Sequence, residues 1–219
     1  VERLIVLDTE TTGLDVDDGH KIIEIGCVEI IDRNITANFF HEYVNPRRPI
    51  EEKAFEVHGI SNESLEGKPV FSEIIKKFMD YISNSTLVIH NAPFDIGFLR
   101  AEISFSGENP DSISVGRNVL DTLKIARKSF PGKRNSLDAL CSRYSVDNTD
   151  RNLHGALLDA KLLANVYLRM TQGQTNIEGL SQSVNKFDQD IIDNVQSRTE
   201  RVVYATSEEI DSHLNYFKK

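Results

Sequence analysis

The sequence has few cysteines and no long apolar run. Its two cysteines, Cys27 and Cys141, both lie in apolar patterns, which predicts buried, reduced thiols rather than a disulfide, and so a reducing compartment. No apolar run reaches the roughly 18 residues that a membrane-spanning helix needs. The start of the chain shows no secretory signal pattern. We therefore expect a cytoplasmic protein with no membrane partner.

Basic residues are also scarce, because 25 Lys and Arg stand against 34 Asp and Glu, which gives a net charge of −9. A chain that binds duplex nucleic acid non-specifically by itself usually has a basic face, so the charge argues against that class. The charge still allows an enzyme whose acidic site is neutralised by divalent cations. It also allows a subunit whose affinity for DNA comes from a partner.

The 219 residues suit one sizeable domain with an appendage. After Met170 a stretch rich in Gln, Asn, Ser and Gly predicts a flexible linker. Order is expected to return at Arg201, and Thr206 with Glu209 matches a helix capping box. The chain begins with Val1 rather than Met, which leaves a short preceding piece open. The predicted division is a domain at 1–171, a flexible linker at 172–200 and a docking segment at 201–219.

Hydrophobic periodicity predicts three strands first and then alternating strands and helices. The turn at Asp32-Arg33-Asn34 joins the second and third strands, so the first three should form an antiparallel meander. The expected strands are 3–8, 22–31, 35–45, 86–90 and 118–123. The expected helices are 69–82, 91–103 with Asn91 as its cap, 123–130, 136–144 and 156–170. This order predicts an α/β fold with a mixed central sheet flanked by helices.

Two carboxylates stand at the end of the first strand, in LDTETTG. Asp8 and Glu10 are two residues apart, and side chains at that spacing share one face of a strand. Taken alone, such a pair most often consists of two solvated acids at a strand end, so it is a weak signal. Asp95, in HNAPFD, follows another apolar strand and lies early in a helix, where an acid is favoured by the helix dipole in any case.

The third acidic position is Asp159, which lies among leucines early in the helix of HGALLDA. His154 precedes it by five residues and lies in the loop that enters this helix. Both side chains can therefore reach one site. We expect this group of acids to lack matching basic partners and so to need divalent cations. Oxygen ligands favour Mg²⁺ or Mn²⁺, and a pair of such ions can clamp a phosphodiester while a histidine takes a proton.

The motifs DTETTG, HNAPFD and HGALLD, in this order, resemble the three motifs of the DEDDh family of 3′→5′ exonucleases. Further stretches, GHKIIEIG, VHGI and FPGKRNSLDALC, resemble the proofreading (epsilon) subunits of bacterial DNA polymerase III. The resemblance covers almost the whole chain. It implies an RNase H-like fold and removal of nucleotides from single-stranded or frayed 3′ DNA ends.

The resemblance assigns a role to each motif residue. It implies that Asp8, Glu10, Asp95 and Asp159 hold two Mg²⁺ or Mn²⁺ ions and that His154 is the general base, with Asp95 counted among the catalytic residues. The residues implied at the terminal nucleotide are Asp8, Glu10, Thr11, Gly13, His58 and Asp159. For His58, a loop histidine without a role remains an alternative. Lys133 and Arg134 could touch phosphates or form a solvated basic turn.

The resemblance also implies partners. The segment 201–219 would dock on the polymerase III catalytic (alpha) subunit, and the small theta subunit could bind the exonuclease domain. Gln174 and Ile177 fit the start of a sliding-clamp motif, but no aromatic residue follows, so a clamp contact is left open. Two alternatives remain: a stand-alone exonuclease in DNA repair or RNA trimming, and a catalytically silent module that only binds partners.

Overall fold

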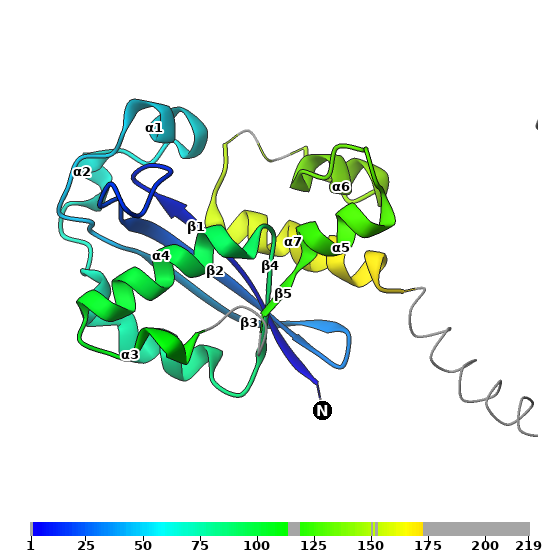
Figure 1. Cartoon of the computed structure of the whole chain (residues 1–219), viewed down its shortest axis with the longest axis horizontal. Coiled ribbons are helices and arrows are strands. Elements are labelled where there is room, and N and C mark those ends of the chain that lie inside the picture. The colour runs from blue at the N-terminus through cyan, green and yellow to red at the C-terminus, as the bar shows by residue number, and fades with distance from the viewer. Residues whose placement is uncertain (1, 114–118, 150, 152, 173–219) are drawn as a thin grey trace, which may run out of the picture. The chain divides into compact units, whose positions relative to one another are not determined.

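The structure is a computed structural model that describes residues 2–113, 119–149, 151 and 153–172 (Figure 1). Within these residues, five strands form one sheet in the order β3-β2-β1-β4-β5. The strands are β1 (Arg3–Thr11), β2 (Ile22–Ile31), β3 (Asn34–Tyr43), β4 (Thr86–Ile89) and β5 (Val119–Asp121). The helices are α1 (Glu52–His58), α2 (Asn62–Leu65), α3 (Phe71–Ile82), α4 (Ala92–Phe105), α5 (Thr122–Ser129), α6 (Leu137–Arg143) and α7 (Ala156–Met170), with a 3₁₀ turn, η1, at Pro110–Ser112.

The sheet is mixed, as the sequence predicts. β1 pairs antiparallel with β2, and β2 pairs antiparallel with β3, which confirms the meander. β4 and β5 run parallel to β1 on its other side. The turn between β2 and β3 places Asp32 at φ 46° and Arg33 at φ 65°. Positive φ at both central residues matches the twist of a tight hairpin.

Side chains of β1 alternate between two hydrophobic layers. Ile5 and Leu7 pack with α3 and α4, whereas Leu4 and Val6 pack with α5, α6 and α7. Because the alternation continues along the strand, Asp8 and Glu10 fall on the face that carries α7. Thr9 falls on the face that carries α4. The two helical layers can be followed on either side of the sheet in Figure 1.

Both cysteines are buried free thiols, one in each layer, as predicted. Three features differ from the sequence prediction or escape it. α1 and α2 were not predicted, since each is too short to show a clear helical period. Asn91 precedes α4, but its backbone is left-handed at φ 69° and its side chain makes no capping bond. Its N–H instead donates to Asp121 Oδ1 at 3.2 Å.

No helix in the described part of the chain is both long and apolar enough to span a bilayer. The predicted docking segment, its capping box and the clamp-like residues lie outside the described residues, as does all of the predicted linker beyond Gln172.

Candidate metal and catalytic site

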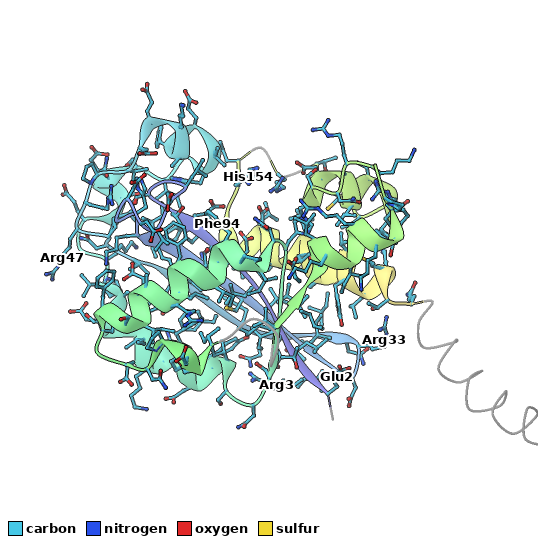
Figure 2. The ribbon with its side chains drawn as sticks, viewed as in Figure 1. Glu2, Arg3, Arg33, Arg47, Phe94 and His154 are labelled. Carbon is cyan, nitrogen blue, oxygen red and sulfur yellow. The ribbon has the colours of Figure 1, made fainter. Side chains whose placement is uncertain are left out.

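A pocket of about 280 Å³ at the carboxyl end of β1 brings together the five residues predicted to carry the chemistry. Asp8 and Glu10 come from β1, Asp95 from α4, Asp159 from α7 and His154 from the loop before α7. Figure 2 shows His154 near Phe94, which also lines this pocket, at the end of the sheet away from Glu2 and Arg3.

The acids of β1 are crowded and partly removed from water. Burial raises the pKa of Asp8 well above its usual range, and the carboxylates of Asp95, Glu10 and Asp159 raise it further. Burial also raises the pKa of Glu10 to about 8, with Asp159 adding to the effect. Clustered carboxylates repel one another, so each favours the neutral form of the next. A bound cation would therefore reduce the electrostatic repulsion among these carboxylates.

Asp95 is fixed by a residue that the sequence reading missed. Thr9 Oγ1 donates a hydrogen bond to Asp95 Oδ1 at 2.7 Å, across the face that carries α4. Burial raises the pKa of Asp95 to about 7, and the Thr9 bond opposes this by favouring the charged form. Residues 8–10 therefore contribute to both helical layers. Thr9 orients Asp95 of α4, whereas Asp8 and Glu10 face α7.

Asp159 owes its position to a close contact between α7 and β2. An added Cβ on Gly26 would lie 2.2 Å from the backbone nitrogen of Leu157, so only glycine allows this approach. Two residues earlier on β2, Glu24 Oε2 accepts the N–H of Ala156 at 3.1 Å. Glu24 Oε1 is paired with His41 Nε2 at 2.7 Å. A buried acid thus ties down the first turn of α7, where Asp159 lies.

The expectation that the acids lack a basic partner is wrong. Arg151 Nε lies 2.6 Å from Asp159 Oδ1, and Arg151 Nη2 lies 2.5 Å from Asp159 Oδ2. The guanidinium therefore neutralises one of the acids, while Asp8, Glu10 and Asp95 have no ion pair with Lys or Arg among the described residues. In the sequence, Arg151 lies in a polar stretch, and no motif or hydrophobic pattern distinguishes it from a solvated loop residue.

The donor set fits hard divalent cations. One ligand atom each from Glu10, His154 and Asp159 lie within 4.8 Å of one another, and Asp8 and Asp95 line the same pocket. Carboxylate oxygens are the ligands that Mg²⁺ and Mn²⁺ prefer. An imidazole nitrogen in this group could serve either as a ligand or as a base, and geometry alone leaves both chemistries available.

Three residues predicted at the terminal nucleotide do not line this pocket: Thr11, Gly13 and His58. Thr11 Oγ1 donates within the turn to the carbonyl of Gly13 at 2.6 Å, and Gly13 packs against the His20 ring so closely that a Cβ would clash. His58 is 5% exposed at the end of α1, and its Nε2 has no hydrogen-bond partner among the described residues. Burial lowers the pKa of His58, which keeps its ring neutral.

A second, more open pocket of about 500 Å³ adjoins the acidic one, because both are lined by His90 and Ser136. Arg127 and Lys133 line the second pocket. Of the two basic residues predicted to touch phosphates, the structure therefore places Lys133 beside the acidic site, whereas Arg134 does not line either pocket.

Replacing Glu10 with glutamine should stabilise the metal-free protein increasingly as the pH rises. The folded chain shifts the pKa of Glu10 from 4.5 to about 8, so the unfolded chain loses this proton first and the wild type loses stability with rising pH. Glutamine does not ionise. The difference in unfolding free energy, from urea titrations in EDTA, should grow between pH 4.5 and about 8. A difference that stays flat across this pH range would contradict the raised pKa of Glu10.

Comparison with known proteins gives consistent matches. A family model described as Exonuclease matches residues 5–167. The chain is 51% identical over 223 residues to the DNA polymerase III subunit epsilon of Escherichia coli K12, covering 97% of this chain and 91% of that protein. It is 45% identical to the same subunit of Rickettsia prowazekii, covering 99% and 96%.

Solved structures share the fold. Exonuclease X, in complex with 5′ overhanging duplex DNA, matches with a TM-score of 0.61 at 28% identity, over 78% of this chain and 92% of that one. The nuclease domain of 3′hExo, a DEDDh family member bound to rAMP, matches with a TM-score of 0.67 at 19% identity and the same coverage. The predicted RNase H-like fold is thereby confirmed.

Proposed function

The chain belongs to the exonuclease family, and from this premise we propose that it removes nucleotides from the 3′ end of DNA as the proofreading epsilon subunit of a bacterial DNA polymerase III. The observation that carries the proposal is the convergence of the DEDDh residues Asp8, Glu10, Asp95, His154 and Asp159 on one pocket. The family is metal-dependent, and an acidic pocket accords with that requirement.

Asp8, Glu10, Asp95 and Asp159 would hold two Mg²⁺ or Mn²⁺ ions. When bound, such ions supply Lewis-acid chemistry that offsets the charge of the acids and of the phosphodiester. The protein contributes rigidity: β1 holds two acids on one face, Thr9 orients Asp95, and Glu24 fixes the start of α7. Preorganised groups cost little rearrangement during reaction.

His154 would take the proton from the attacking water. Burial and the nearby Arg151 lower the pKa of His154, which favours the neutral ring that a general base needs at neutral pH. The ring is 44% exposed at the pocket, which leaves it accessible to water. Asp159 Oδ2 lies 3.5 Å from His154 Nδ1 and would stabilise the ring once it is protonated.

The DNA strand would lie across both pockets. Its terminal phosphodiester would lie among the acids, and preceding phosphates would lie against Lys133 and Arg127 in the adjoining pocket. The unpaired Nε2 of buried His58 would donate to the terminal nucleotide, and the backbone of Thr11 and Gly13 would contact it. Arg127 and Lys133 give an acidic chain a local basic surface for a polyanion.

The relatives are named as subunits of DNA polymerase III, which supports a polymerase partner for this chain. The segment 201–219 would bind the polymerase alpha subunit, and a small theta subunit could bind the exonuclease domain. Work within a bacterial replicative polymerase would place the chain in the cytoplasm.

The test is a release assay on DNA labelled at its 3′ end, either paired or mismatched, with Mg²⁺, Mn²⁺ or EDTA. We expect 3′ mononucleotides only with metal, and faster release from the mismatched end, because a frayed end reaches the pocket without prior melting. Release from the 5′ end, or none with either metal, would overturn the proposal. Equal activity on RNA, with no capture of the alpha subunit through residues 172–219, would favour a stand-alone exonuclease.

A matched variant separates the two chemistries open to His154. His154→Gln should slow release by about 10²–10⁴-fold, the usual contribution of general base catalysis, while Mn²⁺ binding is kept. A loss of Mn²⁺ affinity as large as the loss of turnover would make His154 a ligand instead.

A further inference from the structure

Arg151 makes a two-point ion pair with Asp159. Its Nε and Nη2 lie 2.6 Å and 2.5 Å from the two carboxylate oxygens, and the Arg151 and Asp159 side chains are 6% and 4% exposed. Paired charge-assisted hydrogen bonds of this kind are strong and directional. Because both oxygens of Asp159 are engaged, the carboxylate cannot also bind a cation with the same lone pairs.

The same guanidinium contacts the proposed base. Arg151 Nη2 lies 3.0 Å from His154 Nδ1. A guanidinium has only donors, so His154 Nδ1 must accept, and the neutral ring then carries its proton on Nε2. In this arrangement neither nitrogen of His154 is free to take a proton from water. The Arg151 side chain therefore engages both the proposed metal ligand Asp159 and the proposed base His154.

A second anchor lies on the other side of Arg151. Its Nη1 is 2.7 Å from Asp138 Oδ1, and the Asp138 side chain is 56% exposed at the start of α6. Arg151 itself belongs to the loop between α6 and α7 and lies on neither helix. The guanidinium can therefore release Asp159 without breaking a helix and still remain paired through Asp138.

We propose that Arg151 is a built-in counter-ion that competes with divalent cations for Asp159 and, while paired there, keeps His154 from acting as a base. This rests on the proposed roles of Asp159 and His154. Loading of the site would then exchange one cation for another at Asp159. In the metal-free protein, the pair with Arg151 keeps Asp159 from being an unpaired buried charge, which would be costly.

The test measures Mn²⁺ binding without DNA, by electron paramagnetic resonance of the free ion, in the full chain. Arg151→Ala should bind Mn²⁺ at least about tenfold more tightly than wild type, because no guanidinium has to be displaced from a strong pair. Arg151→Lys, which cannot make the two-point pair, should lie between them. The control Arg100→Ala removes one positive charge from an exposed pair with Asp111 and should leave the affinity unchanged.

Thermal unfolding gives a second readout. Without metal, Arg151→Ala should unfold at a lower temperature than wild type, and Mn²⁺ should raise its Tm by more than it raises that of wild type. If Arg151→Ala does not fold, Arg151→Lys carries the same test. A folded variant with unchanged or weaker Mn²⁺ affinity would overturn the proposal, even if Asp8 variants prove inactive and the exonuclease function stands.

Nitrogen NMR of the histidine rings tests whether Arg151 keeps His154 from acting as a base. In metal-free wild type, His154 should carry its proton on Nε2, and this preference should weaken in Arg151→Ala. If His154 of the wild type were protonated on Nδ1, Arg151 would not be donating to that nitrogen, and this part of the proposal would be wrong.

Discussion

Asp8→Asn should abolish nucleotide release while making the metal-free protein harder to unfold. The variant keeps the shape of the side chain and removes one charge from a cluster in which burial and Asp95 raise the pKa of Asp8. Without metal, that charge is a cost of folding. In its proposed role as a metal ligand, Asp8 would contribute several kcal/mol of transition-state stabilisation, so kcat/KM should fall by about a thousandfold or more.

The measurement pairs a release assay in Mn²⁺ with thermal unfolding in EDTA. Asp80→Asn, at an exposed acid paired with Lys76 on α3, is the matched control and should keep full activity. A stabilised and active Asp8→Asn would remove Asp8 from the metal site. An inactive variant that unfolds at a lower temperature in EDTA would mean that Asp8 supports the fold rather than straining it.

Gly26→Ala should cost at least about 3 kcal/mol of stability, toward the upper end of single-residue effects. The added Cβ would lie 2.2 Å from the nitrogen of Leu157 and 2.3 Å from the carbonyl carbon of Ala156. Both are backbone atoms, so rotating a side chain gives no relief and α7 must move away from β2. Asp159 moves with the helix, and a shift of about 1 Å at a catalytic group lowers activity by about a hundredfold.

Gly97→Ala is the control within the same chain. Gly97 lies inside α4, and apart from its own turn of the helix an added Cβ has no neighbour within 4 Å, so alanine should stabilise the protein by up to about 1 kcal/mol through helix propensity. Urea unfolding and the release assay check both variants. If Gly26→Ala unfolds like wild type, the close contact between β2 and α7 does not position Asp159.

The strands and longer helices could be predicted because their patterns are local. The alternation at Asp8 and Glu10 and the helical period of Phe71–Ile82 are visible within a dozen residues, and the structure confirms both. The convergence of five dispersed residues could be expected only because three motifs together resembled a family. Short helices such as α1 and α2 carry too few turns for a period to appear.

The supporting contacts could not be predicted because they join residues far apart in sequence or unremarkable in type. Glu24 lies in a β-branched run, and its partner Ala156 is 132 positions away. Thr9 is 86 positions from Asp95. Arg151 is only eight residues from Asp159, but a basic residue in a polar loop gives no sign that it turns inward. Such partners emerge only when the layers pack.

The alternation of β1 makes the site intolerant of any change in strand length. One residue inserted between Arg3 and Asp8 would exchange the two faces beyond it, turning Asp8 and Glu10 toward α3 and α4 and Thr9 toward α7. Natural variation in chain length should therefore be absent from this stretch and should gather in the loops. For an engineer, β1 therefore tolerates no insertion, and a tag or fused domain belongs elsewhere.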